Sequence, residues 1–317
     1  MTVPVPALRL DPHPTSGSTF PSMPTTVLDT DTGLSQVLAA PPREREARLR
    51  SLLEPMAGMY RYFPGDVDLV QVHRAGFGFP LTGSDEQCAA ALTALRDADA
   101  WTRVEDALAH GVTVLQEAVP GLTVPDLTVL LVLGDPTDAY FTGPARGFSG
   151  NGSATGFLSL TVWPTQENLD RLEAAAVHEL HHNLRYAPGG VVWDPATVTV
   201  GEQVVSEGLA DAFARQLYGD RLGHTPIGRP HLGDDAVLAR VVEGLDVTGM
   251  QHFVSWVHGD EAARRFGADP VGLPTGAGYA AGNRLVDAHL AAAGTDAAQA
   301  LHVSSRVVLG AASTLLG

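Results

Sequence analysis

The sequence predicts an α+β fold in which a small sheet is followed by a group of helices. Residues 127–133 form an apolar run that ends at Gly134, as expected of a buried strand, and residues 157–163 alternate like a second strand. After residue 165 the apolar residues recur every three or four positions, which indicates helices. Hydrophobic residues make up 44% of the 317 residues, which is enough for a large core.

The N-terminal part is predicted to be mainly helical. Residues 1–28 are rich in Pro, Ser and Thr and are expected to form an extended or disordered lead. Helices are expected over residues 44–59, 85–97 and 101–119, and a strand over residues 67–72. We therefore divide the chain into this lead, a helical part over residues 29–125 and a second part over residues 126–317, without a sharp boundary.

One helix of the second part carries a cluster of histidines. Thr165 is its expected N-cap, and the breaker residues 186–190 end it. His178 and His182 are four residues apart, so they lie on the same side of the helix. A different face is apolar and consists of Leu169, Leu172, Ala176, Leu180 and Leu184.

Residues 178–182 read His-Glu-Leu-His-His, which is the H-E-x-x-H pattern. The two histidines of this pattern can hold one metal ion, and Glu179 can take a proton from a metal-activated water. The competing interpretation is a solvated helix that happens to contain three histidines. The apolar face and the small residues Ala174 and Ala175 beside the histidine row favour metal binding. His181 points away from that row and is expected to line the cleft or to be solvated.

A catalytic zinc site needs a third protein ligand and an open position for water. The next helix, expected to begin at a capping box of Thr199 and Glu202, carries Glu207 and Asp211 on one face. Two carboxylates on an otherwise apolar helix are costly to bury unless they are paired or bind a metal. We expect Glu207 to be the third ligand, and Asp211 to accept the free ring N–H of His178.

Each carboxylate also has a simpler interpretation. Glu207 could be a charge that faces solvent, and Asp211 could pair with Arg215, its neighbour one turn later. The histidine motif upstream favours the metal-binding interpretation for both. Gly219 is the expected end of this helix, and further helices are expected over residues 260–266 and 297–316.

These motifs resemble those of the gluzincin metallopeptidases, of which thermolysin is the familiar member. Three blocks, VHELHH at 177–182, SEGLAD at 206–211 and GYAAG at 278–282, are similar to a bacterial family of predicted zinc-dependent proteases known mainly as a domain of unknown function. The resemblance covers about residues 100–300, a domain-sized length. It implies that residues 126–317 form a zincin-like catalytic domain, with a small mixed sheet, the two ligand-bearing helices and Zn²⁺ as cofactor.

The third block places Tyr279 at the start of a helix rich in small residues. Gly278, Ala281 and Gly282 would let this helix approach another backbone closely. Metallopeptidases of the type that the chain resembles use a Tyr or His to stabilise the oxyanion, and such a donor is worth about 3 kcal/mol. The alternative is that Tyr279 is only packed in the core. The competitors for the role are His252, His258 and His289.

Peptide hydrolysis also requires a surface that holds an extended substrate. The strand expected over residues 157–163 lies just before the histidine helix, and we interpret it as an edge strand that could pair with substrate backbone. The glycine-rich residues 147–153 before it are expected to form a mobile loop. The alternative is that residues 157–163 are simply a member of the sheet.

The composition excludes several classes of partner. The formal net charge is −16, so a nucleic-acid backbone is not an expected partner, and all 20 basic residues are arginine. No apolar run approaches the roughly 20 residues of a membrane helix, and no leader peptide is visible. Cys88 is the single cysteine, which is compatible with a reducing compartment. We expect a cytoplasmic protein and make no prediction of its oligomeric state.

Together these features predict a zinc metallopeptidase that acts on a peptide or protein. His178, His182 and Glu207 would bind Zn²⁺, Glu179 would be the general base, and Tyr279 would stabilise the oxyanion. One alternative is a non-haem iron oxygenase, because its ligand set of two histidines and one carboxylate is nearly the same. Another is a zinc-stabilised binding or regulatory protein without turnover, which would have no use for a base beside the first ligand.

Overall fold

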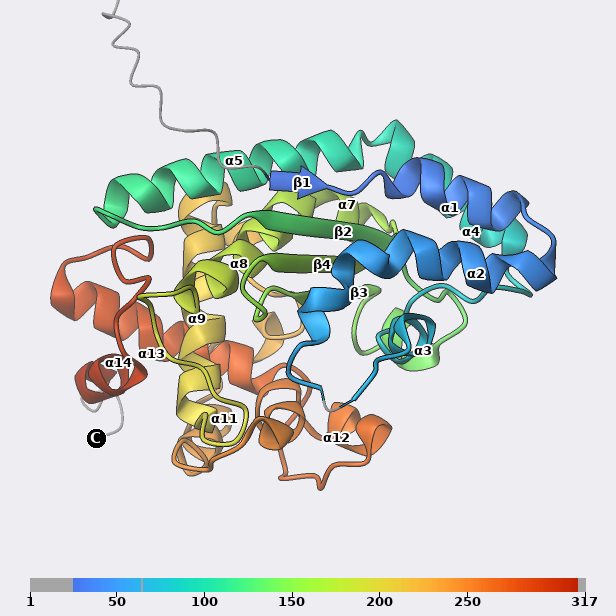
Figure 1. Ribbon diagram of the computed structural model, residues 1–317. Helices are drawn as coiled ribbons and strands as arrows, with labels where there is room; N and C mark the ends of the chain where they lie inside the picture. Colours follow the sequence, from blue (N-terminus) through green and yellow to red (C-terminus); the bar gives the residue numbers. More distant parts are fainter. Residues whose placement is uncertain (1–24, 64, 313–317) are drawn as a thin grey trace, which may run out of the picture.

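The computed structural model describes residues 25–63 and 65–312, and it has the α+β architecture that the sequence predicts (Figure 1). The strands are β1 (Thr25–Val27), β2 (Leu127–Leu133), β3 (Phe148–Asn151) and β4 (Phe157–Val162). The helices before β2 are α1 (Thr30–Ala39), α2 (Pro42–Leu53), the 3₁₀ helix η1 (Glu54–Tyr60), α3 (Leu69–Ala75), α4 (Asp85–Asp97) and α5 (Ala100–Ala118). Those after β2 are α6 (Ala139–Thr142), α7 (Gln166–Asp170), α8 (Leu172–Arg185), α9 (Val200–Tyr218), α10 (Asp220–Gly223), η2 (Arg229–His231), α11 (Asp235–Val242), η3 (Met250–His252), the π-helix η4 (Val254–His258), α12 (Asp260–Phe266), α13 (Ala277–Ala293) and α14 (Ser305–Ala312).

The four strands form one mixed sheet in the order β1-β2-β4-β3. Strands β1, β2 and β4 are parallel, and β3 is antiparallel to β4, with Phe148 opposite Val162. Strand β2 is apolar along most of its length because it lies inside the sheet with neighbours on both sides. The interpretation of residues 157–163 as an edge strand is therefore wrong. The edge is β3, which lies in the segment that we expected to be a loop.

One expectation for the N-terminal part also fails. The strand expected over residues 67–72 is instead the start of helix α3, because the Asp68 side chain accepts hydrogen bonds from the backbone N–H groups of Val70 and Gln71 and so caps a helix. The expected lead, residues 1–28, lies outside the described residues up to residue 24. Its last part is ordered, since Thr25–Val27 form strand β1 at the other edge of the sheet.

Both predicted parts of the chain contribute to one hydrophobic core. It contains Leu34 and Leu49 from the N-terminal helices together with Leu180 from the histidine helix. Helix α5 packs directly on α8, where a Cβ on Gly111 would lie 2.8 Å from the Leu180 side chain. At the C-terminus the expected helix over residues 297–316 is shorter: residues 297–302 are turns, and α14 begins at Ser305.

Helices α9 and α13 cross at unusually short range, as the small residues of α13 predict. A Cβ on Gly208 would lie 2.2 Å from the carbonyl oxygen of Gly282, and a Cβ on Gly282 would lie 2.3 Å from the carbonyl oxygen of Val204. Only glycine allows this approach, and the approach brings the start of α13 close to the carboxylates of α9.

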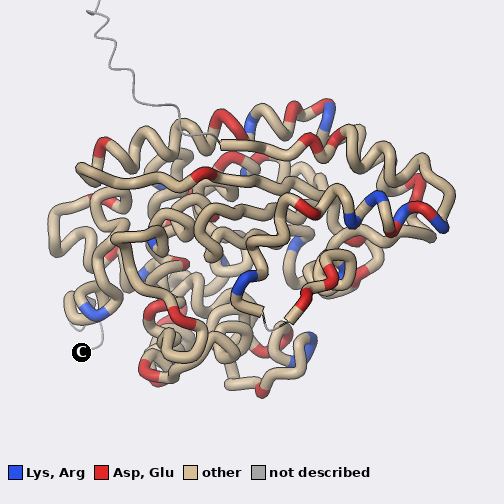
Figure 2. The backbone as a smooth tube through the Cα atoms, in the orientation of Figure 1, with Lys and Arg blue, Asp and Glu red and all other residues tan. Residues whose placement is uncertain are grey.

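Charge and hydropathy agree with the composition. Figure 2 shows acidic positions distributed over many elements rather than gathered in a single patch. In the part of the chain that the structure describes, no helix combines the length and the apolar character needed to cross a membrane.

Candidate metal centre

Helix α8 carries both histidines of the H-E-x-x-H pattern toward helix α9. The Thr165 hydroxyl accepts a hydrogen bond from Asn168 N, as expected of an N-cap, but the helix that it caps is the short α7. A break at Arg171 separates α7 from α8. His178 and His182 are then one turn apart, and their rings lie edge to face with centroids 4.8 Å apart. Both side chains are buried.

Three potential ligand atoms converge between α8 and α9. Glu207 Oε2 is 3.1 Å from His178 Nε2 and 3.3 Å from His182 Nε2, and the two Nε2 atoms are 3.1 Å apart. A tetrahedral zinc ion with bonds of about 2.0–2.1 Å separates its ligand atoms by about 3.3–3.4 Å. The triangle has nearly this size, so His178, His182 and Glu207 could hold one metal ion.

The far side of each imidazole is also engaged. His178 Nδ1 lies 2.9 Å from Asp211 Oδ1, and His182 Nδ1 lies 2.9 Å from the Ser206 hydroxyl. A carboxylate can only accept, so His178 donates its Nδ1 proton to Asp211, and Nε2 of the neutral ring keeps a lone pair. The lone pair of His178 and the oxygen of Glu207 then face each other at hydrogen-bond distance. Such a donor set requires a cation, either a metal or a proton.

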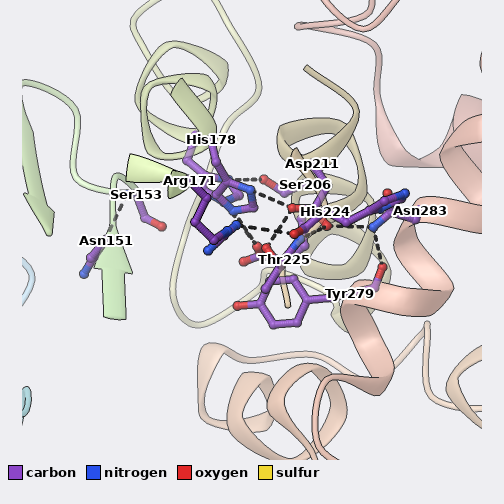
Figure 3. A network of polar contacts seen from close by, with 12 residues as sticks. Asn151, Ser153, Arg171, His178, Ser206, Asp211, His224, Thr225, Tyr279 and Asn283 are labelled. Carbon is purple, nitrogen blue, oxygen red and sulfur yellow. Dashed lines mark hydrogen bonds and ion pairs between the residues drawn. The ribbon is translucent and has the colours of Figure 1, made fainter. Parts of the chain in front are cut away.

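Asp211 is fully occupied by hydrogen bonds, and Figure 3 shows the network around it. Besides His178, it accepts hydrogen bonds from the backbone N of Thr225 at 3.0 Å, the Thr225 hydroxyl at 2.8 Å and Asn283 Nδ2 at 2.7 Å. Arg215 does not pair with Asp211, because it forms ion pairs with Asp220 and Asp287 instead. The alternative interpretation of Asp211 is therefore wrong.

Three residues of this network were not predicted from the sequence. Ser206 and Asn283 are buried polar residues on otherwise apolar helices, the same signal that identified the two carboxylates, and this signal was available in the sequence. Thr225 lies in a loop after α10 and carried no such signal.

The capping box expected at the start of α9 is half formed. The Thr199 hydroxyl accepts a hydrogen bond from Glu202 N, while the Glu202 side chain forms an ion pair with Arg185 at 2.8 Å.

The pKa values of His178, Glu207 and Asp211 are shifted in the directions that favour a positive charge among these side chains. Burial alone would lower the pKa of His178, but its hydrogen bonds to Asp211 and Glu207 outweigh burial and raise it to about 10. For Glu207, burial would raise the pKa, but the charge of His182 and the hydrogen bond from His178 hold it far below its usual range. Asp211 behaves likewise: the hydrogen bond from His178 overcomes burial and lowers its pKa.

Glu179 lies against the edge strand β3. Burial raises the pKa of its carboxyl group, and the charges of His178 and His182 oppose this effect. A Cβ on Gly150 would lie 2.0 Å from Glu179 Oε1, and one on Gly152 would lie 1.9 Å from the Glu179 carbonyl oxygen. Glycine is therefore required at Gly152, where this segment meets the backbone of α8, and a side chain at Gly150 would displace the Glu179 carboxylate.

Tyr279 projects from the first turn of α13 toward the same region (Figure 3). Burial, followed by the negative charges of Glu207 and Glu179, raises the pKa of its hydroxyl well above the usual value, so the hydroxyl keeps its proton. The ring of His258 packs on Tyr279 with centroids 5.7 Å apart, and burial lowers the pKa of His258. His252 and His289 make no hydrogen bond or ion pair with the three potential ligands.

His181 does not line a cleft and is not solvated, contrary to expectation. It is completely buried, its ring lies 5.7 Å from the Phe213 ring, and burial lowers its pKa well below the usual value. The reason is that α8 is buried on all sides, so a residue off the ligand row points into the core.

Comparison with known proteins is consistent with this geometry. Residues 104–310 match the family described as "Predicted Zn-dependent protease (DUF2268)". The chain belongs to this family. It is also similar to the "Uncharacterized protein YjfC" of Bacillus subtilis (strain 168), with 29% identity over 201 residues. That match covers 63% of this chain and 66% of the relative, just under two thirds of its length. No solved structure matches the chain.

Proposed function

We propose that this protein is a zinc-dependent peptidase that hydrolyses peptide bonds with Glu179 as the general base. The observation that carries the proposal is the convergence of His178, His182 and Glu207 next to a buried glutamate. A purely structural metal site has no use for that carboxylate, because its fourth position is normally closed by another protein ligand. Membership of a family of predicted zinc-dependent proteases supports the same function.

Zinc fits the donor set of two imidazole nitrogens and one carboxylate, with Asp211 and Ser206 orienting the rings from behind. When bound, zinc would supply Lewis-acid activation of a water molecule and of the substrate carbonyl. Glu179 accepts a proton from the attacking water and passes it to the departing amine, so each peptide bond broken consumes one water. Its raised pKa brings it closer to the value at which it can both accept and return a proton.

Two other groups complete the proposed site. Tyr279 keeps its proton and donates it as a hydrogen bond to the oxygen that becomes negative in the tetrahedral intermediate. Among the described residues no strand pairs with the outer edge of β3 beside Glu179, and an extended peptide can add to that edge through backbone hydrogen bonds. The expected substrate is therefore a peptide or protein in an extended conformation. A cytoplasmic location stays a prediction.

The first experiment is metal analysis and peptidase assay of the wild type beside two variants. We expect about one zinc per chain in the wild type, and loss of zinc in Glu207→Ala. Glu179→Gln should keep its zinc and lose about 10²–10⁴-fold in kcat, because only the proton transfer is removed. Glu117→Gln, an exposed glutamate on α5, is the matched control and should behave as the wild type.

Each result separates this proposal from its alternatives. Full turnover by Glu179→Gln would refute the assignment of the base. Iron in place of zinc, together with oxygen-dependent chemistry, would favour an oxygenase with the same ligand set. Zinc without cleavage of any peptide in a complex library would favour a binding or regulatory protein.

A further inference from the structure

Arg171 is a buried cation that the proposed mechanism does not use. It lies at the break between α7 and α8 and is only 4% exposed. Within residues 25–63 and 65–312, its one hydrogen bond is a long one, 3.4 Å to the carbonyl oxygen of His224, and its Nε has no partner. The other deeply buried arginines of the described chain each have a carboxylate: Arg45 pairs with Asp85, and Arg185 pairs with Glu202.

The Arg171 guanidinium lies between the edge strand β3 and a loop that contacts the candidate metal centre. Its central carbon lies 5.7 Å from the ring of Phe148, the first residue of the edge strand β3. On the other side is the loop of His224 and Thr225, which reaches Asp211. Figure 3 shows the Arg171 side chain between β3 and this loop. Burial lowers the pKa of Arg171 to about 10, against the attraction of Asp211, so it remains charged at neutral pH.

A second arginine adds to this positive charge. Arg229, in η2, is half-buried, makes no side-chain hydrogen bond or ion pair within the described residues, and lowers the pKa of Arg171 through charge repulsion. With a divalent cation bound, the two arginines and the carboxylates of Glu179, Glu207 and Asp211 sum to a charge of +1. One carboxylate from a ligand would neutralise this excess.

We propose that Arg171, assisted by Arg229, binds a carboxylate of the substrate about two residues from the bond that is cleaved. This inference rests on the proposed peptidase function and names the substrate class. Gly150 of β3 lies against Glu179, while Phe148, beside Arg171, is two residues away along the strand, a distance of about 6.6 Å. In a substrate strand paired with β3, the residue about two positions away from the reacting carbonyl would therefore lie beside the Arg171 guanidinium.

A carboxylate is the group that fits. The planar guanidinium forms paired hydrogen bonds with a carboxylate, and its Nε, which has no partner, is one of the donors in that arrangement. The carboxylate can be the C-terminus of a short peptide or the side chain of an acidic residue. The first source would make the protein remove short C-terminal fragments, and the second would make it cleave near Asp or Glu within a chain.

The test is cleavage-site profiling of a peptide library with the zinc-loaded protein. We expect cleavage sites to be enriched at least tenfold in a carboxylate about two positions away, and this enrichment to disappear in Arg171→Met. Carboxyl amidation of the C-termini and replacement of Asp and Glu by Asn and Gln distinguish the two sources. Arg146→Met is the matched control, because Arg146 is nearby but already paired with Glu167, and its preference should equal that of the wild type.

The outcomes separate the two proposals. No cleavage of any peptide would refute the peptidase function, whereas cleavage without carboxylate enrichment, or enrichment that survives Arg171→Met, would overturn the role of Arg171. Binding gives a readout without turnover: zinc-loaded Glu179→Gln should bind N-acetylglutamate about 10- to 100-fold more tightly than N-acetylglutamine amide, which has no carboxylate, and addition of Arg171→Met should remove the difference. Equal binding of the two probes by Glu179→Gln would also overturn the inference.

Folding of the variant provides an independent check. Methionine fills a similar volume and removes an unpaired buried charge, so Arg171→Met should melt at the same temperature as the wild type or higher. A marked fall in melting temperature would mean that Arg171 stabilises the fold, which contradicts the argument. Arg229→Met changes a half-buried residue and should reduce the carboxylate preference only partly.

Discussion

Replacement of Asp211 by asparagine tests how the site prepares His178 to bind a metal. The Oδ1 atom of Asp211 accepts from His178 Nδ1 at 2.9 Å and from the Thr225 hydroxyl at 2.8 Å. Its Oδ2 atom accepts from Thr225 N at 3.0 Å and from Asn283 Nδ2 at 2.7 Å. All four partners donate, and this pattern holds the proton of the neutral His178 ring on Nδ1.

An asparagine at this position can satisfy all four partners in only one way. Its oxygen must face Thr225 N and Asn283, because both can only donate there. Its NH₂ group then donates to the Thr225 hydroxyl, which can rotate, and to His178 Nδ1, which must become an acceptor. The ring proton therefore moves to Nε2, the atom that lies 3.1 Å from Glu207 and that is needed for the metal.

The magnitude follows from the hydrogen bond that must be given up. To bind zinc, the variant has to keep the His178 proton on Nδ1, where it points at the N–H group of the asparagine side chain. The variant therefore loses a charge-assisted hydrogen bond of about 1.5–3 kcal/mol. This corresponds to a zinc affinity weaker by roughly 10- to 150-fold. The range overlaps the 10- to 100-fold loss that is typical when the partner of a metal-binding histidine is removed.

The assay is competitive zinc titration of the purified protein against a chromophoric chelator near neutral pH. Nitrogen NMR of His178 in the metal-free protein, above its pKa, reports the tautomer directly and should show the proton on Nε2 in Asp211→Asn. Asp287→Asn, which alters an exposed partner of Arg215, is the control and should leave zinc affinity unchanged. Zinc affinity in Asp211→Asn within about twofold of the wild type would refute the reasoning.

Two further predictions concern the pH dependence of zinc binding and the contact between α9 and α13. The pKa of His178 is raised from 6.5 to about 10, so below about pH 10 zinc must displace a proton from the His178 ring. Zinc affinity should therefore rise by up to about tenfold per pH unit until about pH 10. A flat pH profile in competitive zinc titrations would contradict this. Gly208→Ala places a Cβ 2.2 Å from the carbonyl oxygen of Gly282 and should lower the free energy of unfolding by about 1–3 kcal/mol in denaturant titrations. Gly233→Ala, where nothing lies within 4 Å of the new Cβ, should leave stability nearly unchanged, and equal effects of the two substitutions would argue against close packing as the cause.

Local patterns were read correctly where the chain itself determines the geometry. Helix α4 and strand β2 have the bounds expected from the sequence, because apolar spacing and a terminal glycine or cap are local signals. The expected strand over residues 67–72 was wrong because another local signal, a helix cap, outweighed the apolar pattern. Its short apolar run suits either structure, and the cap provided by Asp68 decided in favour of a helix.

Features that depend on neighbours could not be predicted. The strand over residues 157–162 was recognised, but its place inside the sheet depends on its pairing with β2 and β3, which are distant partners. His181 was expected near solvent, but burial of α8 on every side places it against Phe213. The lack of a carboxylate beside Arg171 is likewise a property of the folded chain.

The sequence by itself determined which residues share one face of a single helix. The spacing of His178 and His182 suffices, because residues four apart on a helix share a face, and the carboxylates of Glu207 and Asp211 follow the same rule. Only the tertiary structure decided that these two faces meet at about 3 Å, because the approach depends on the contacts of α9 with α8 and α13. The position of the edge strand β3 against Glu179 also depends on Gly152, where a Cβ would lie 1.9 Å from the Glu179 carbonyl oxygen, and on Gly150, where a Cβ would displace the Glu179 carboxylate.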